Sequence, residues 1–344
     1  MLSSGNYSTD QKRFLFLSLA SLILCILIVS RLLALTPVEV ILLLAFLLRL
    51  HQPLLADLRM GNVNQLQLLP IALFIFALAR SKPLLAGSVM GVATAFKPTT
   101  ILVLAFGFLV FLIDRDYRQS ARMLVGSATA VLAAILFSGF YFGTSSVWFA
   151  FFHSLRNTLN GSAYSLENGN FSLSVLLFGP TSRSSTIVPV VLLSAFLWLL
   201  IASRRSDRTA TVSEQDSSRI RFHSAFCVGG GGCAIMLLSS PLAWIHYYVL
   251  LLPLSLYVIS PACSIGFPGF TENGWLSKVV GVALRYAPLF VFSLLFNALV
   301  GDRPKTICVG LITATFVTLA LSAHQLWRQR CPVSLVAPET GSRL

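Results

Sequence analysis

Three ionisable side chains in apolar surroundings are the first candidates for chemistry in this sequence, and they are Asp57, Lys97 and His246. A carboxylate can act as a general base, and an imidazole can relay protons or donate to a phosphate. An ammonium at membrane depth either extends to the surface or binds an anion such as a phosphate. His246 follows Trp244 closely and precedes two tyrosines, and such an aromatic group also fits an anchor at the membrane surface. Both interpretations of this stretch stay open.

Amide side chains form a second group of candidates, in the stretch "GNVNQLQLLP". Asn62 and Gln65 have the spacing of a capping box at the start of a helix, which explains these two without a ligand. Asn64 and Gln67 lie three residues apart on one helical face, where they can present donors and acceptors to a sugar or a lipid headgroup. A capping box alone would leave these last two without a role.

A third polar stretch, "ENGNFSLSVLLFGP" at residues 167–180, runs from a turn into an apolar segment. Glu167 and Asn170 are its candidates for contact with a polar ligand. The alternative is a loop that rests on the bilayer surface.

Membrane helices must position these candidates, because the chain is 56% hydrophobic and only 11% charged, with a mean hydropathy of +0.81. Apolar stretches of about 20 residues, the length that crosses a bilayer, recur along the sequence. We predict an all-α polytopic transmembrane bundle of about nine to eleven membrane segments, with short or re-entrant helices among them. Residues 14–326 would form this single domain, between a polar amino-terminal segment, 1–13, and a polar tail, 327–344.

The expected membrane segments are residues 14–35, 37–50, 64–80, 83–96, 98–113, 119–142, 184–203, 222–239, 244–262, 279–299 and 306–326. Two of them, 37–50 and 83–96, are too short to cross alone and suggest half-helices or re-entrant pieces. Lys97 and Pro98 would then form the tip of a hairpin, since proline disfavours helix in the residue before it.

The net charge of +13 indicates the orientation of the bundle rather than a nucleic-acid partner, because the basic residues are scattered. Arginine and lysine mark the cytoplasmic parts, which are 80–82, 114–122, 204–221 and the tail. The opposite face then receives Lys97 and the segments 51–63, 143–183 and 239–246. We therefore expect all candidate residues to converge on one extracytoplasmic face.

Small residues indicate where helices approach closely. Gly87, Gly91 and Ala95 recur at four-residue spacing, which favours helix packing. The four glycines at 229–232 lack phosphate-loop spacing, so close packing or a local break is the better interpretation. The six cysteines include no close metal-binding pair, and most lie in apolar segments as small buried hydrophobes. We expect no metal site and no cofactor.

Four stretches occur in order, namely "DLRMGNVNQLQLL", "LLAGSVMGVATAFKPT", "NGNFSLSVLL" and "LSSPLAWIHYYVLLLPL". Together they resemble the family 87 glycosyltransferases, polytopic enzymes of the GT-C class that include bacterial polyprenol-phosphate-mannose-dependent mannosyltransferases. The resemblance implies a multi-pass hexosyltransferase of the plasma membrane, with membrane lipids around it and a polyprenyl-phosphate mannose-like sugar as donor. It also implies a lipid-linked or glycan acceptor and transfer on the extracytoplasmic face.

For a transferase of this type we expect the following roles for the candidate residues. Lys97 would bind the donor phosphate, and His246 would bind phosphate or transfer a proton. The substrate-binding residues would be Asn62, Asn64, Gln67, Asn170 and Trp244.

The general base is expected from a different part of the protein. GT-C enzymes typically carry this carboxylate in a first extracytoplasmic loop that follows an initial helix, whereas this chain opens on "MLSSGNYSTDQKRF" and enters a membrane helix at once. We expect the missing helix and its Asp-containing loop to be encoded upstream or supplied by another chain. If the chain acts alone, Asp57 is the first candidate for the base.

The main alternative function is a transporter or flippase of a lipid-linked saccharide, and another is a noncatalytic homologue. An enzyme forms a new glycoside in detergent, whereas a transporter needs a sealed vesicle and leaves its substrate unchanged.

Overall fold

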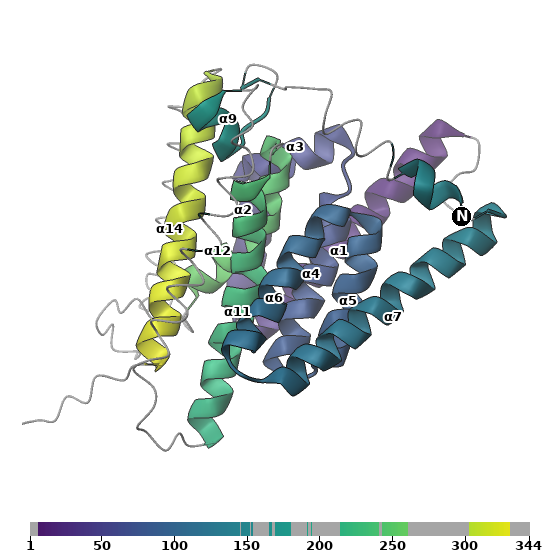
Figure 1. The fold of residues 1–344 in the computed structure, drawn as a ribbon. Helices are drawn as coiled ribbons and strands as arrows, with labels where there is room; N and C mark the ends of the chain where they lie inside the picture. The colour runs from purple at the N-terminus through teal and green to yellow at the C-terminus, as the bar shows by residue number, and fades with distance from the viewer. Residues whose placement is uncertain are drawn as a thin grey trace, which may run out of the picture.

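The computed structural model describes residues 6–144, 146–151, 153, 165, 166, 169–179, 191, 194, 214–240, 243–260 and 303–330. Within them the chain is helical and no strand occurs. The helices are α1 (Tyr7–Leu32), α2 (Pro37–Leu50), α3 (Gln52–Met60), α4 (Asn64–Ala79), α5 (Pro83–Phe96), η1 (Pro98–Thr100), α6 (Ile101–Ile113), α7 (Tyr117–Phe142), α9 (Leu173–Phe178), α11 (Glu214–Ser239), η3 (Ile245–Leu251), α12 (Leu252–Ile259) and α14 (Pro304–Arg330). Figure 1 shows them as a bundle of roughly aligned helices.

Several of these helices can cross a membrane, which confirms the prediction of an all-α polytopic bundle. Four in the described part are long and apolar enough, namely Tyr7–Leu32, Tyr117–Phe142, Ser218–Ser239 and Pro304–Leu326. A fifth candidate is the pair α2 and α3, which is bent by 61°. The helices α4, α5 and α6 are apolar but shorter.

Most predicted segments agree with the observed helices. The bounds of α2 and α5 are those expected, and the break between α5 and η1 falls at Lys97 as predicted. The helix α1 begins at Tyr7, before the expected membrane segment 14–35, because Asn6 accepts the N–H of Thr9 at 3.3 Å and Asp10 lies in the first turn. The helix α3 was not predicted. The segments 184–203 and 279–299 lie outside the described residues.

The direction of the central helices follows from their glycine contacts. A Cβ on Gly91 would lie 2.5 Å from the carbonyl oxygen of Ser127, one on Gly87 would meet the backbone of Met123, and one on Gly126 would meet that of Leu84. Residue numbers thus rise together along α5 and α7, so these two helices are parallel, and α6, which connects them along the chain, runs in the opposite direction. The predicted close packing at the small residues of α5 is confirmed.

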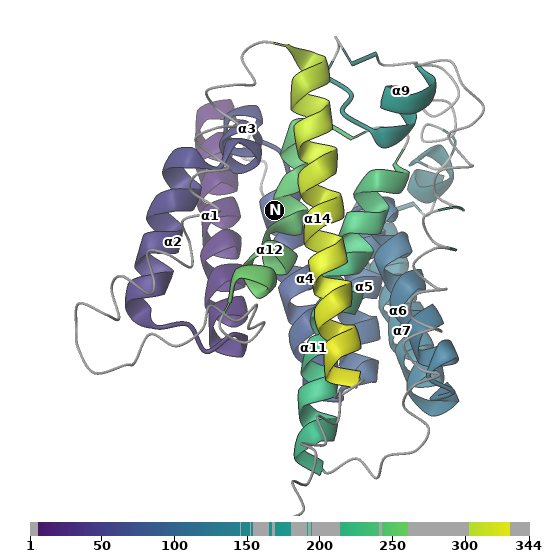
Figure 2. The same cartoon turned by 90° about the vertical axis from the view of Figure 1, so that its left-hand side faces the viewer.

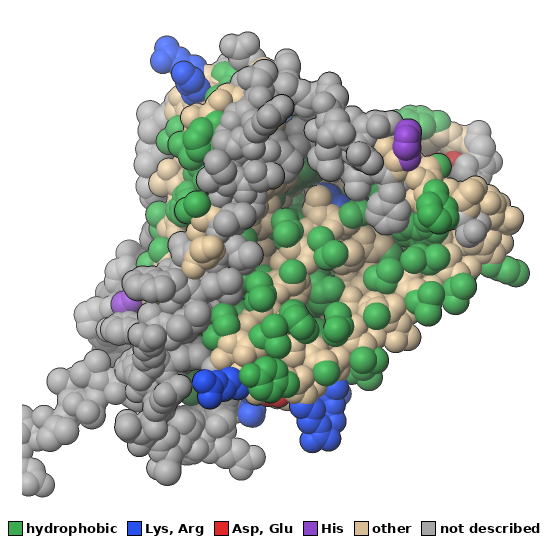
Figure 3. Space-filling view, in the orientation of Figure 1, with side chains coloured by type: hydrophobic (Ala, Val, Ile, Leu, Met, Phe, Trp, Pro, Cys, Tyr) green, Lys and Arg blue, Asp and Glu red, His purple; other side chains and the backbone are tan. Residues whose placement is uncertain are grey.

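The two ends of the bundle hold different turns and side chains. One end holds the α4–α5 and α6–α7 turns, where exposed basic side chains gather, and these are Arg80, Lys82, Arg115, Arg118 and Arg122. Figure 3 shows Lys and Arg along this lower edge, apolar side chains scattered over the face above it, and further Lys and Arg at the top of the view. The opposite end holds the start of α4, the break after α5 and the end of α11.

The helix α11 forms the centre of the core. It contacts α4, α6, α12 and α14, and Figure 2 shows α1 and α2 on one side of it and α6 and α7 on the other. Its four consecutive glycines allow this contact: a Cβ on Gly230 would lie 2.6 Å from Leu254 Cβ, and one on Gly232 would lie 3.0 Å from Val103 Cγ1. Close packing, rather than a helix break, is the role of this run.

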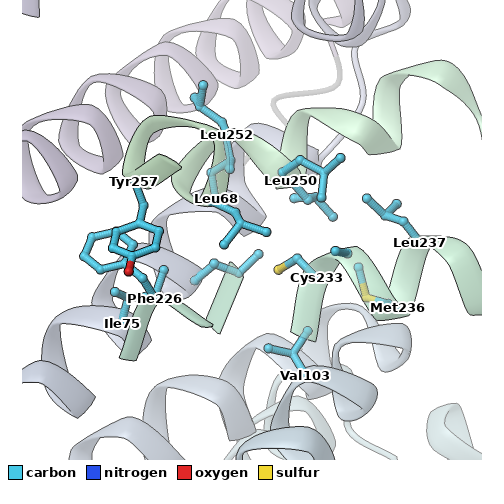
Figure 4. Close-up of a cluster of buried hydrophobic side chains, with 14 of the residues drawn as sticks. Leu68, Ile75, Val103, Phe226, Cys233, Met236, Leu237, Leu250, Leu252 and Tyr257 are labelled. Atoms are coloured by element: carbon cyan, nitrogen blue, oxygen red, sulfur yellow. The ribbon is translucent and has the colours of Figure 1, made fainter. Parts of the chain in front are cut away.

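Apolar side chains from these elements interlock around α11. Figure 4 shows Leu68 and Ile75 of α4 together with Val103 of α6 and Tyr257 of α12, gathered around residues of α11. Four cysteines of the described part are buried free thiols, as the sequence predicted, and these are Cys25, Cys227, Cys233 and Cys308.

Candidate functional site

The candidate site lies at the end of the bundle away from the basic turns, where helices start, stop and bend. Gly61 adopts φ 64° and ends α3, and α4 begins three residues later. Lys97 has an extended backbone between α5 and η1, and Trp244 has one immediately before η3. Each of these breaks places a polar or aromatic side chain at the same end of the protein.

Asn64 is the centre of this cluster. Its Nδ2 donates to Asp57 Oδ1 at 2.6 Å and to the backbone oxygen of His246 at 3.4 Å, and its Oδ1 accepts from Lys97 Nζ at 2.7 Å. The side chains of Asn64 and Asp57 are both fully buried. One amide thus joins a carboxylate of α3, an ammonium after α5 and the backbone of η3.

Lys97 has two partners among the described residues. Its Nζ lies 4.0 Å from the centre of the Tyr247 ring, in a cation–π contact, in addition to its bond to Asn64. Lys97 lies between two helices rather than within one. Burial lowers the pKa of its ammonium to about 8, and the charge of Asp57 acts against this shift. An ammonium has three N–H donors, so this geometry leaves donors for an anion.

His246 contacts Asn62 from the other side of the cluster. Asn62 Nδ2 lies 3.0 Å from His246 Nε2, and because an amide nitrogen can only donate, Nε2 accepts. The imidazole is buried and lies against the rings of Trp244 and Tyr247, with centroid distances of 5.8 and 4.9 Å. An anchor at the membrane surface would not need this buried bond.

The capping-box interpretation of the amide stretch was wrong. The residue that caps α4 is Val63, and it makes no side-chain cap hydrogen bond. Asn62 instead reaches η3, across 184 residues of sequence. The free backbone N–H groups at the start of α4 would favour a capping side chain, but the contact of Asn62 with η3 takes precedence.

Gln65 and Gln67 are buried amides without matching partners. Gln67 is fully buried, and neither its Oε1 nor its Nε2 has a hydrogen-bond partner among the described residues. The Nε2 of Gln65 is in the same state. Leaving such groups unpaired costs about 1–3 kcal/mol each, so they favour a polar ligand at this end of α4.

The stretch around Asn170 belongs to the same end and is packed into the protein. The Oδ1 of Asn170 accepts the N–H groups of Ala243 and Ser172, at 3.0 and 3.2 Å. The backbone N–H of Phe171 donates to the backbone oxygen of Ala243 at 2.6 Å. The backbone oxygen of Phe171 accepts from the Tyr248 hydroxyl at 2.8 Å. These buried contacts do not fit a loop that lies on the bilayer surface. Glu167 lies outside the described residues.

The structure thus brings together most of the residues that the sequence singled out. Hydrogen bonds join Asp57, Asn62, Asn64, Lys97 and His246. Trp244 lies against the imidazole, and Asn170 accepts the backbone N–H of Ala243, the residue before Trp244. Gln67 lies one helical turn along α4 and is not bonded to them. Sequence reasoning missed the role of Tyr247 as the ring beneath Lys97, although it had noted this tyrosine as part of the aromatic group.

The fold and this cluster define a polytopic membrane protein with a buried network of ammonium, carboxylate and amides at one end. A family model described as glycosyltransferase family 87 matches residues 10–216, more than half of the chain. The chain belongs to this family and is a membrane glycosyltransferase. The match includes the stretches around Asn64, Lys97 and Asn170 and ends before that of His246. No curated protein and no solved structure matches the chain.

Proposed function

We propose that the protein transfers a mannose-like hexose from a polyprenyl-phosphate sugar to a lipid-linked or glycan acceptor on the extracytoplasmic face of the plasma membrane. The observation that carries this proposal is the joining of Lys97 and Asp57 through Asn64. Transfer from a phosphate-linked sugar needs a cation at the leaving phosphate and a base at the acceptor hydroxyl, and these are the two charges held here.

In the proposed reaction the acceptor hydroxyl oxygen attacks the anomeric carbon of the donor sugar. A new carbon–oxygen bond forms there while the bond from that carbon to the phosphate oxygen breaks, and polyprenyl phosphate leaves with the electron pair. Lys97 stabilises the charge that develops on this phosphate. The hydroxyl proton goes to the base, for which Asp57 is the candidate within this chain.

The remaining polar groups fit recognition of the substrates. The amide of Gln67, which has no partner among the residues that the structure describes, offers a donor and an acceptor to sugar hydroxyls. Asn62 and His246 together offer a second pair, once a phosphate or hydroxyl replaces their mutual bond. Trp244 presents a half-buried aromatic face beside them, and Asn170 supports the turn that carries Trp244.

Charge asymmetry supports the extracytoplasmic side. The end of the bundle opposite the site carries the exposed Arg and Lys side chains of two turns, and loops rich in these residues remain in the cytoplasm. By this rule the site faces away from the cytoplasm. A lipid-linked donor would reach it from the bilayer on that side.

The test is sugar transfer by the purified full chain in detergent. Several radiolabelled polyprenyl-phosphate hexoses are each offered with a lipid-linked acceptor, and the product is identified as a glycoside. Formation of a new glycoside from one of these donors, faster with mannose than with its epimers, supports the proposal. Movement of an unchanged lipid-linked saccharide across sealed proteoliposomes, with no glycoside formed in detergent, would replace it with the transporter alternative.

A further inference from the structure

We infer that Asn64 is a positioning residue, which sets the place of the Lys97 ammonium relative to the Asp57 carboxylate, rather than a ligand of the sugar. The inference deepens the proposed function and rests on it for the role of Lys97. It changes the expectation for Asn64, which the sequence alone had placed among the substrate-binding amides.

The hydrogen-bonding capacity of Asn64 is almost fully used within the protein. A primary amide has two N–H donors and one oxygen acceptor. Both donors are taken, by Asp57 and by the backbone oxygen of His246, and the oxygen accepts from Lys97. No donor of this amide therefore remains for a sugar hydroxyl. Gln67, on the same helical face, is an amide for which the described part of the chain gives no partner at either end.

The geometry also explains why an amide is suited to this position. No described carboxylate forms an ion pair with Lys97, so Asp57 acts on it from beyond a direct contact. An amide between the two charges accepts from the cation with its oxygen and donates to the anion with its nitrogen. It therefore keeps both groups charged and apart, whereas a direct ion pair would use the Lys97 donors that a phosphate needs.

Two contacts hold the Lys97 ammonium, the Tyr247 ring and the Asn64 oxygen. Only the bond to Asn64 is directional, so it sets the position of the ammonium. The charged and titratable groups around the ammonium are Asp57 of α3 and His246 and Tyr247 of η3. The face of the Tyr247 ring lies against one side of the ammonium and attracts it through a cation–π contact rather than a hydrogen bond. Without the Asn64 oxygen, the flexible lysine stem would be free to leave the ring or to pair with Asp57.

A double-mutant cycle tests this role in the full chain. Asn64→Leu and Lys97→Met are measured alone and together, using kcat/KM for glycosyl transfer. If Asn64 acts through Lys97, each single change lowers kcat/KM by about tenfold or more, and the second change adds little to the first. Independent, multiplying losses would show that Asn64 contacts the substrate itself and would overturn the inference.

A second measurement does not depend on transfer. The rate of reductive methylation of Lys97 is followed by mass spectrometry against pH, because only the neutral amine reacts. Asn64→Leu should move the midpoint of this profile: to lower pH if the ammonium stays buried over Tyr247 without its acceptor, and to higher pH if it pairs with Asp57. Gln65→Leu is the matched control: it removes an equally buried amide of α4 whose Nε2 has no partner among the described residues, and it should leave the midpoint unchanged.

The two measurements separate the inference from the proposed function. An unmoved Lys97 midpoint in Asn64→Leu, in protein that keeps the melting temperature of Gln65→Leu, overturns the positioning role whatever the activity. A shifted midpoint in a chain that forms no glycoside from any donor keeps the positioning role and removes the proposed reaction.

Discussion

The charge of Lys97 is the single property on which the proposed reaction depends most. Its Nζ carries one bond to Asn64 and lies over Tyr247, and its remaining donors are available to a phosphate. His246 is the other side chain whose bonding, a single contact to Asn62, can be exchanged for a substrate. Both residues are therefore open to direct tests.

Replacing Lys97 or His246 with alanine should lower the rate of glycosyl transfer by at least tenfold, about 1.4 kcal/mol in the barrier. The reason is the loss of a group that stabilises charge on the leaving phosphate or moves a proton. Lys82→Ala is the matched control, because Lys82 is exposed at the opposite end of the bundle. Full activity of both variants, in folded protein, would mean that Lys97 only extends to the membrane surface and that His246 only belongs to an aromatic anchor.

The pH dependence should report the same lysine. Its pKa is lowered to about 8 by burial, so the ammonium is present below that pH and loses its proton as the pH rises through it. We expect kcat/KM, which reports groups of the free enzyme, to fall above pH 8. Lys97→Arg should be slower but should lose this basic limb, because a guanidinium stays charged. A flat wild-type profile between about pH 7 and 9 would contradict this account.

At the scale of helices, α5 packs against α7 with backbone close to backbone, and this contact holds the break at Lys97 in place. Gly91 lies against the backbone of α7, with Ala130 Cβ 2.9 Å from the position of an added Cβ. The two helices are parallel, so their packing aligns the end of α5 with the site. Any side chain added at this contact must separate them.

Gly91→Ala should destabilise the protein by about 1–3 kcal/mol through overpacking, despite the better helix propensity of alanine. Gly139→Ala is the control on α7, since an added Cβ there meets nothing within 4 Å. Thermal unfolding in detergent should show a lower melting temperature for the first variant and an equal or higher one for the second. Equal melting temperatures in both would mean that the glycine is not needed for packing.

For the molecule as a whole, the question is which end of the bundle faces the cytoplasm. The described native cysteines are buried, and Cys263 and Cys331, outside the described residues, are replaced by serine so that single exposed cysteines can be measured against a low background. Ser146 follows the end of α7 at the site end, and Ser218 lies near the start of α11 at the other end, and both are exposed.

Ser146→Cys should react with a membrane-impermeant maleimide added to intact cells, and Ser218→Cys should react only after the cells are opened. This pattern follows from the basic turns remaining in the cytoplasm. The extent of labelling is measured by gel shift. The reverse pattern would place the site in the cytoplasm and would remove the proposed extracytoplasmic transfer.

The amino-acid sequence by itself determined the class of fold and the end of the protein where the site lies. Apolar length decides what crosses a bilayer, and scattered Lys and Arg decide which loops lie together, so both can be counted along a chain. The bounds of α5, the break at Lys97 and the close packing of Gly87 and Gly91 follow from such local rules. The gathering of polar stretches at one end followed from the same count.

Only the tertiary structure decided what each polar side chain does. Asn62 had the spacing of a cap but bonds to His246, and Asn64 was assigned to a sugar but joins Asp57 to Lys97. Partners that lie 33 and 184 residues away leave no periodic signal in the sequence. A buried amide binds whichever donor or acceptor the packing of helices brings within about 3 Å, and that choice is made in three dimensions.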